Sequence, residues 1–167
     1  VLLKAAGAPP NIEALMAFAL PAAIVLGPVY GLANALAMRA LYDGYMGWAG
    51  WWTVMTSFSY GLVGLAAGYF GLWKRSWNRI EIVLLAAGLT LLYDVVTMLL
   101  FGLAFGIPLG ALVVGQIPFT INHLIGNCLL CFAFSPLLLR VLKGYVCVKT
   151  EERAPLPVVL RAQQKKD

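Results

Sequence analysis

The sequence predicts an all-α fold, a polytopic bundle of membrane-spanning helices, from its composition and from the length of its uncharged stretches. Of the 167 residues, 62% are hydrophobic and 11% are charged, which is far from the composition of ordinary soluble domains. Between Ile82 and Leu139 the only charged residue is Asp94. A helix crosses hydrocarbon with about 20 apolar residues, so this stretch can cross a bilayer twice and the whole chain about five times.

The first two predicted spans are short. Asn11 is expected to cap a helix whose first turn holds Glu13, where a carboxylate complements the helix dipole. The apolar segment 14–26 follows, and Gly27-Pro28 predicts a turn before the second segment, 29–41. Because both segments are shorter than a full span, we expect tilted helices, or helices packed within the bundle.

The third predicted span, 53–73, contains no charged residue and has interfacial signals at both ends. Tryptophans gather just before it, at Trp48, Trp51 and Trp52, as in the aromatic belt of a membrane interface. The segment 74–79 follows it with three Lys and Arg residues. Such cations favour the cytoplasmic side of a membrane.

The fourth and fifth spans are predicted over 80–103 and 120–139. Between them, 105–118 is rich in Gly and Pro, which predicts an irregular or re-entrant stretch at the face opposite the basic segment. Irregular backbone is tolerated at membrane depth only where protein or water covers it. We therefore expect this stretch to cover part of the bundle.

Basic residues predict the orientation. The segment 74–79 and the stretch from Arg140 onward carry most of the positive charge, so the positive-inside rule places both in the cytoplasm. We divide the chain into a transmembrane bundle, 1–144, and a basic cytoplasmic tail, 145–167. The chain would then begin outside, so we expect a sixth span in the parent fold, and a multi-pass protein of the plasma membrane. The net charge of +5 does not indicate a nucleic-acid partner, because the cations lie beside apolar runs.

Small residues recur at helical spacing along the predicted spans. Gly27 and Gly31 lie four residues apart, and Gly61, Gly64 and Gly68 keep to one helical face. Such faces allow helix backbones to approach closely, which predicts packing inside the bundle. A docking surface for another membrane protein is the alternative.

Asp94 is the first functional candidate, because a carboxylate inside hydrocarbon is costly. Thr90 and Thr97 share its helical face, one turn to either side. The structural alternative is an ion pair between Asp94 and Arg39 that holds two helices together. Arg39 could instead pair with Asp43, four residues further along its own helix.

A similar stripe follows the fifth span. Thr120, His123 and Asn127 share a face, and Asn122 lies to one side of it. Consecutive spans are antiparallel, so we expect both stripes to face one outward-opening pocket, with Asp94 at its floor. A packing role is the alternative for His123. The predicted ligand-binding residues are Asp94, Asn122, His123, Asn127, Tyr93 and Thr97.

Signatures of soluble enzymes are missing from the sequence. It has no Gly-rich phosphate loop, no H-E-x-x-H motif and no G-x-S-x-G elbow. Cys128 and Cys131 have no second pair with which to form a zinc site. We therefore expect neither an enzyme nor a resident cofactor.

Several motifs resemble the substrate-binding S components of energy-coupling factor (ECF) transporters. The segment 11–43, with its Gly27-Pro28-x-x-Gly31 turn, resembles the second and third helices of that family. In the C-terminal half, Tyr93-Asp94, the run 115–120 and Asn122-His123-x-x-x-Asn127 are similar to vitamin-type members whose substrate is unassigned.

The resemblance implies the small membrane subunit of a vitamin or cofactor importer. Such a subunit binds its nutrient at the outer face and docks on a transmembrane T subunit that two cytoplasmic ATPase subunits drive. By position, Asp94, Asn122, His123 and Asn127 would bind the nutrient, and 105–118 would form part of a lid. The family's first helix, with its alanine-rich docking face, has no counterpart in this sequence.

Two other functions stay open at this point. A structural membrane scaffold of the MreD type predicts that Asp94 pairs with Arg39 and that no cavity separates the fourth and fifth spans. A proton-coupled secondary transporter would use Asp94 and His123 as a proton relay.

Overall fold

The computed structural model describes residue 7 and residues 12–47 and 49–153, with side chains up to residue 146. The described chain forms five helices and no strand, which confirms the predicted all-α class. The predicted cap Asn11, the tryptophan Trp48 and the tail from residue 154 lie outside the described residues. The helices are α2 (Leu15–Leu26), α3 (Pro28–Tyr45), α4 (Trp51–Trp73), α5 (Arg79–Phe105) and α6 (Leu109–Arg153).

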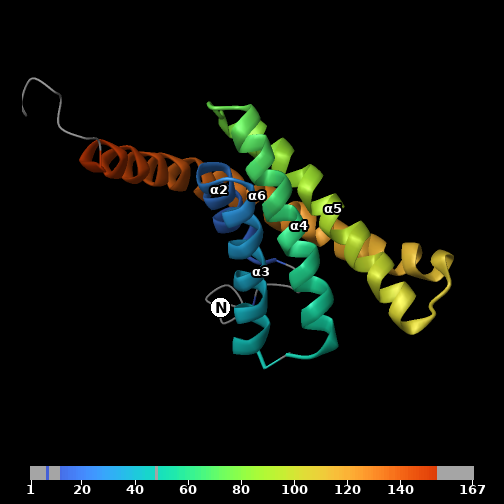
Figure 1. Ribbon diagram of the computed structural model, residues 1–167. Coiled ribbons are helices and arrows are strands. Elements are labelled where there is room, and N and C mark those ends of the chain that lie inside the picture. The colour runs from blue at the N-terminus through green and yellow to red at the C-terminus, as the bar shows by residue number, and fades with distance from the viewer. Residues whose placement is uncertain (1–6, 8–11, 48, 154–167) are drawn as a thin grey trace, which may run out of the picture.

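The short helix α2 packs against α3, α4 and α6 and lies on the side of the bundle away from α5 (Figure 1). α3 and α4 run antiparallel as a closely packed pair, α5 lies beside α4, and α6 runs antiparallel to α5 and also packs on α2. The α4–α5 connection lies at one end of the bundle, while the α3–α4 and α5–α6 connections lie toward the other (Figure 1). The C-terminal end of α6 extends beyond the other helices.

Local chemistry sets several helix ends. At the start of α5, the Asn78 side chain accepts a hydrogen bond from the Glu81 backbone N–H, and Glu81 accepts one from the Asn78 backbone N–H, both at 2.9 Å. At its end, Gly106 adopts the left-handed conformation, with φ of 63°, that terminates many helices. Gly27, with φ of 90°, makes the break between α2 and α3, and Pro28 begins α3.

Glycines allow α3 and α4 to pack with their backbones in contact. A Cβ atom at Gly64 would collide with the Gly31 backbone, and one at Gly68 would collide with Gly27 and Pro28. The predicted packing role of these small residues inside the bundle is therefore confirmed.

The core is built around α2, most of whose side chains are buried although the helix has only 12 residues. This helix packs against α3, α4 and α6, and Ser135 of α6 donates a hydrogen bond to the Ala17 carbonyl at 3.0 Å. The largest fully buried apolar side chains are Met16, Leu20, Val63 and Ile82.

Among the described residues, two helices, not five, are long and apolar enough to cross a membrane: α5 and the 38-residue part Leu109–Val146 of α6. This corrects the predicted number of spans. α2 is too short, and α3 carries the charged residues Arg39 and Asp43. α4 has sufficient length but is rich in Trp, Tyr, Gly and Ser, which lower its hydropathy.

The predicted irregular stretch 105–118 is wrong. The chain leaves helical geometry only at 106–108, and α6 then continues as one 45-residue helix through Pro118 and Pro136. The prediction rested on proline as a helix-breaking residue. One proline removes a single backbone donor, however, and an apolar helix held by its neighbours tolerates that loss. α6 also runs through the predicted boundary between bundle and tail at 144/145.

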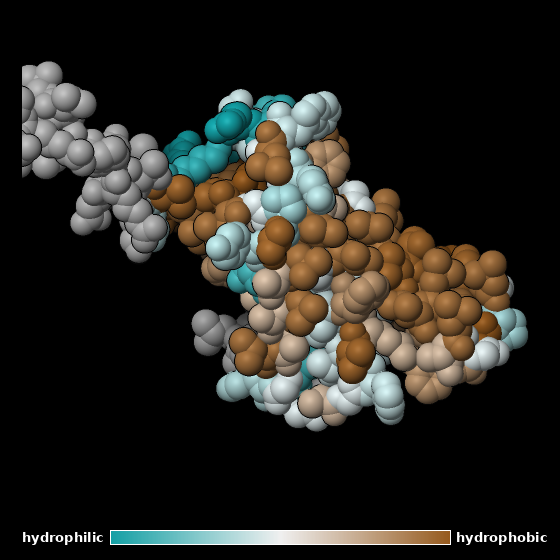
Figure 2. All heavy atoms as spheres, in the orientation of Figure 1, coloured by the Kyte–Doolittle hydropathy of each residue, from teal (hydrophilic) through white to brown (hydrophobic). Residues whose placement is uncertain are grey.

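Apolar side chains cover a broad outer face of the molecule (Figure 2). Among the exposed apolar side chains of α5 and α6 are Leu84, Leu103, Val114 and Leu129. Hydrophilic residues gather mainly at the ends, most densely near the α4–α5 connection (Figure 2). Monomeric soluble proteins rarely expose a continuous apolar surface of this extent.

Candidate functional site

The carboxylate of Asp94 and the imidazole of His123 meet between α5 and α6. Nδ1 of His123 lies 2.7 Å from Oδ1 of Asp94, and the two side chains are 17% and 2% exposed. An ionised carboxylate only accepts hydrogen bonds, so Nδ1 then carries the shared proton and Nε2 of a neutral ring is left as an acceptor. The contact places the one buried acid of α5 beside the one histidine of the chain.

A second polar contact lies one turn away. Asn127 of α6 donates from Nδ2 to the Thr90 hydroxyl at 2.9 Å, and that hydroxyl donates to the Ala86 carbonyl at 2.7 Å. Asp94 bonds to His123, and Thr90 bonds to Asn127. The two stripes therefore face each other, as their spacing predicts.

Aromatic rings close one side of the Asp94–His123 pair. The ring of Tyr93 meets that of His123 edge to face at a centroid distance of 5.7 Å, and that of Tyr60 at 5.2 Å. Edge-to-face contacts fix ring orientation in a packed interior. Tyr60 thus extends the site onto α4.

A hollow of about 330 Å³ lies between the beginning of α4, the end of α5 and the beginning of α6. Asp94, Tyr93, His123 and Asn127 do not line it, so this hollow is not the predicted pocket with Asp94 at its floor. Its walls are mainly apolar and include the rings of Trp52, Phe101 and Phe119. Thr97, one turn from Asp94 on α5, and Gln116 contribute its polar groups. Cavities of about 300 Å³ and above are the usual size for small-molecule sites.

Two buried polar atoms near this hollow lack a well-formed hydrogen bond: Oδ2 of Asp94 and the hydroxyl of Thr97. A buried polar atom without a partner costs free energy of about 1–3 kcal/mol. Of the two residues, only Thr97 lines the hollow.

Arg39 does not pair with Asp94. It forms ion pairs with Asp43 at 2.9 Å and with Glu13 at 3.0 Å, and the Thr56 hydroxyl donates to Asp43 at 3.2 Å. The predicted alternative, a pair between Arg39 and Asp43, is confirmed. The structural pairing of Asp94 with Arg39 is not formed.

The predicted site residues do not all come together. Tyr93, His123 and Asp94 form one contiguous cluster, and Asn127 lies one turn away beside Thr90. Thr97 lines the hollow. Asn122 is partly exposed and makes no hydrogen bond to the side chains of that cluster among the described residues.

Comparison with known protein families, characterised proteins and solved structures finds no match for this chain.

Sequence reasoning missed the contribution of α4 and of the segment before α2. Thr56 and Tyr60 lie one turn apart on α4 and are both buried, a polar face that the spacing could have revealed. Glu13 is predicted to complement a helix dipole, but its carboxylate accepts a hydrogen bond from Arg39, 26 residues away. Nothing in the local sequence identifies that partner.

The described residues contain no cluster of three side chains able to hold a metal ion. The arrangement offers instead an acid–imidazole pair, aromatic edges and an apolar hollow. Such a combination suits non-covalent recognition of a small molecule with one polar edge and one flat apolar body.

Proposed function

We propose that this protein is a membrane-embedded binding subunit that captures a small heterocyclic nutrient, in the manner of the S component of an ECF importer. The observation that carries the proposal is the buried Asp94–His123 pair, together with an apolar hollow of ligand size that Thr97 lines one helical turn from Asp94. A carboxylate buried in an apolar helix is costly and needs a reason, and a ligand contact supplies one.

The proposed placement puts all five described helices in the membrane, whereas helix length and hydropathy alone support only α5 and α6. α5 and α6 would span the bilayer, and α2, α3 and α4 would pack with them as shorter or more polar members of the same bundle. The broad apolar outer face supports contact with lipid (Figure 2). The basic residues at the α4–α5 connection and on the last part of α6 would face the cytoplasm, as would the C-terminus of this plasma-membrane protein.

The site indicates the chemistry of the ligand. Oδ2 of Asp94 would accept a hydrogen bond from an N–H or O–H group, and Nε2 of His123 could accept a second. The flat body of the ligand would lie in the hollow among Trp52, Phe101 and Phe119. We therefore infer a donor-bearing heterocycle, such as a vitamin or a cofactor precursor.

Delivery would require partners, because the described chain has no nucleotide-binding motif. By its resemblance to S components, the protein would dock on a transmembrane T subunit powered by two ATPase subunits. The ligand would enter from the end of the bundle that holds the α5–α6 connection.

Ligand binding tests the proposal. The full chain, purified in mild detergent, would be screened by native mass spectrometry for a co-purified compound, whose affinity is then measured by titration. Asp94→Asn should weaken binding about tenfold or more, because a hydrogen bond to a charged group contributes about 1.5–3 kcal/mol. Glu81→Gln removes a carboxylate at the far end of α5 and should leave affinity within about twofold.

The proposal fails if Asp94→Asn, like the control Glu81→Gln, binds with wild-type affinity. It also fails if no vitamin-like compound binds the wild type at all. A double variant, Asp94→Asn with His123→Gln, retains the shape and the hydrogen-bonding capacity of the pair. We expect this double variant to fold, so a loss of binding in it would not be caused by unfolding.

Proton-coupled transport is a second candidate, favoured by the 2.7 Å contact between an acid and an imidazole. Such a pair can exchange a proton during a transport cycle. Uptake into liposomes by this chain alone, abolished when the proton gradient is collapsed, would support it. The scaffold alternative required a pair between Asp94 and Arg39, and Arg39 instead bonds to Glu13 and Asp43.

A further inference from the structure

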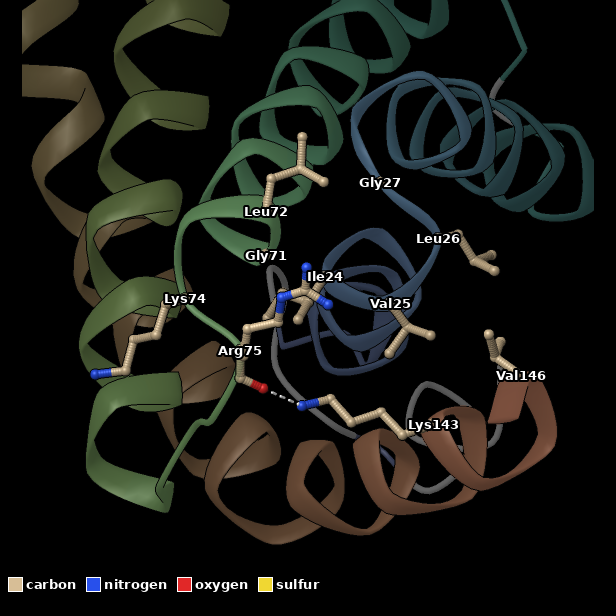
Figure 3. Close-up of a pocket in the computed structure, with 10 residues that line it drawn as sticks. All are labelled: Ile24, Val25, Leu26, Gly27, Gly71, Leu72, Lys74, Arg75, Lys143 and Val146. Carbon is tan, nitrogen blue, oxygen red and sulfur yellow. Dashed lines mark hydrogen bonds between the residues drawn. The ribbon is translucent and has the colours of Figure 1, made fainter. Parts of the chain in front are cut away.

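A second hollow, of about 430 Å³, lies at the opposite end of the bundle from the α5–α6 connection (Figure 3). It is formed where the end of α2, the end of α4 and the last part of α6 come together. It shares no lining residue with the hollow that Thr97 lines.

Two cations face this hollow without a carboxylate partner. The guanidinium of Arg75 turns into the space beside Ile24 and Gly71, and Lys143 reaches in from α6 to donate to the backbone carbonyl of Arg75 (Figure 3). Lys74 points away and forms an ion pair with Glu81 at 2.7 Å. Within the part of the chain whose side chains are described, neither Arg75 nor Lys143 pairs with an acid.

The edges of the same hollow are apolar. Leu26, Leu72 and Val146 line it, and each of the three side chains is exposed to the surroundings of the bundle. Two cations next to exposed aliphatic side chains suit a ligand that carries both an anionic group and hydrocarbon chains. Gly27 adds no side chain to the wall of the hollow, and Gly71 packs directly against the Ile24 backbone.

We propose that this hollow binds the phosphate of an anionic phospholipid, whose acyl chains run outward along Leu26 and Leu72. Arg75 offers a planar fork of donors that fits phosphate oxygens, and Lys143 adds a second positive charge. Basic pockets between membrane helices on the cytoplasmic side bind anionic headgroups by this chemistry. The inference rests on the membrane placement proposed above, and not on ligand capture at Asp94.

Lipid selectivity tests the site. The full chain in mild detergent is titrated with phosphatidylglycerol and, separately, with phosphatidylcholine of identical acyl chains, and bound lipid is counted by native mass spectrometry. Phosphatidylglycerol should bind about fivefold more tightly or better, since each cation near an anionic headgroup contributes about 1 kcal/mol. Arg75→Gln and Lys143→Gln should each lower that affinity about fivefold.

Arg140→Gln is the matched control. It removes one positive charge at the same end of the bundle, but Arg140 does not line this hollow. Its affinity for phosphatidylglycerol should stay within about twofold of wild type. Arg75→Gln also keeps the backbone carbonyl to which Lys143 donates, so its result does not depend on loosening α6.

Three outcomes would overturn the proposal. Equal binding of the two lipids would show that the headgroup is not recognised. An equal loss in Arg140→Gln would mean that diffuse charge attracts the lipid. Displacement of phosphatidylglycerol by millimolar inorganic phosphate would identify a site for soluble phosphate. Asp94→Asn should leave lipid binding unchanged, so failure here and failure of nutrient capture are distinguishable.

Discussion

At the level of single residues, one carboxylate oxygen of Asp94 bonds to His123 while the other has no well-formed hydrogen bond. The pair sits in an apolar interior, where the attraction between partners and the cost of desolvation are both large. Breaking such a pair leaves an uncompensated polar group, whereas replacing both partners by apolar side chains removes the problem. Asp94 and His123 should therefore be coupled in stability as well as in binding.

A double-mutant cycle measures this coupling. His123→Leu alone should destabilise the protein by about 3 kcal/mol, because it leaves the Asp94 carboxylate buried and unpaired. The double variant Asp94→Leu with His123→Leu should be more stable than that single variant. Unfolding midpoints in detergent give the three differences. Strictly additive effects would contradict the coupling and would indicate that the 2.7 Å contact adds no stability.

At the level of elements, the sequence predicted best the helices whose ends are marked locally. The predicted span 80–103 differs by one or two residues at each end from α5, because Asn78 and Glu81 form its N-terminal cap and Gly106 ends it. The prediction from local signals was wrong for the beginning of α6. Its continuity depends on neighbouring helices that tolerate Pro118, and no local signal reports neighbours.

The contact between α3 and α4 makes a quantitative prediction. Gly64→Ala should destabilise the protein by about 1–3 kcal/mol, because its Cβ would meet the Gly31 backbone and the two helices would have to separate. Gly88→Ala is the matched control on α5, where a Cβ meets open space. That variant should be neutral or slightly stabilising, since alanine favours a helix by up to about 1 kcal/mol. Equal losses in both variants would refute the close approach of α3 and α4.

At the level of the whole molecule, the site was predicted in part. The pairing of Asp94 with His123 follows from stripes on two consecutive helices, which the antiparallel run of α5 and α6 brings together. The partners of Glu13 and Tyr60 could not be derived, although the spacing of Thr56 and Tyr60 marks a polar face on α4, because these partners lie on helices distant in sequence. The number of spans was overestimated, because α2 is too short to cross a bilayer and polar residues lower the hydropathy of α3 and α4.

The proposed arrangement in the membrane fixes which connections face each side. Ser76, in the α4–α5 connection, and Ala49, in the α3–α4 connection, belong to connections at opposite ends of the bundle (Figure 1). Single cysteines placed at these positions, after the native cysteines have been replaced by serine, should therefore react from opposite sides of a sealed membrane. A membrane-impermeant maleimide added to intact cells should label Ala49→Cys, whereas Ser76→Cys should react only after the cells are opened. Labelling of both positions from outside would rule out a bundle that spans the bilayer between these connections, and the reverse pattern would invert the orientation while leaving the span intact.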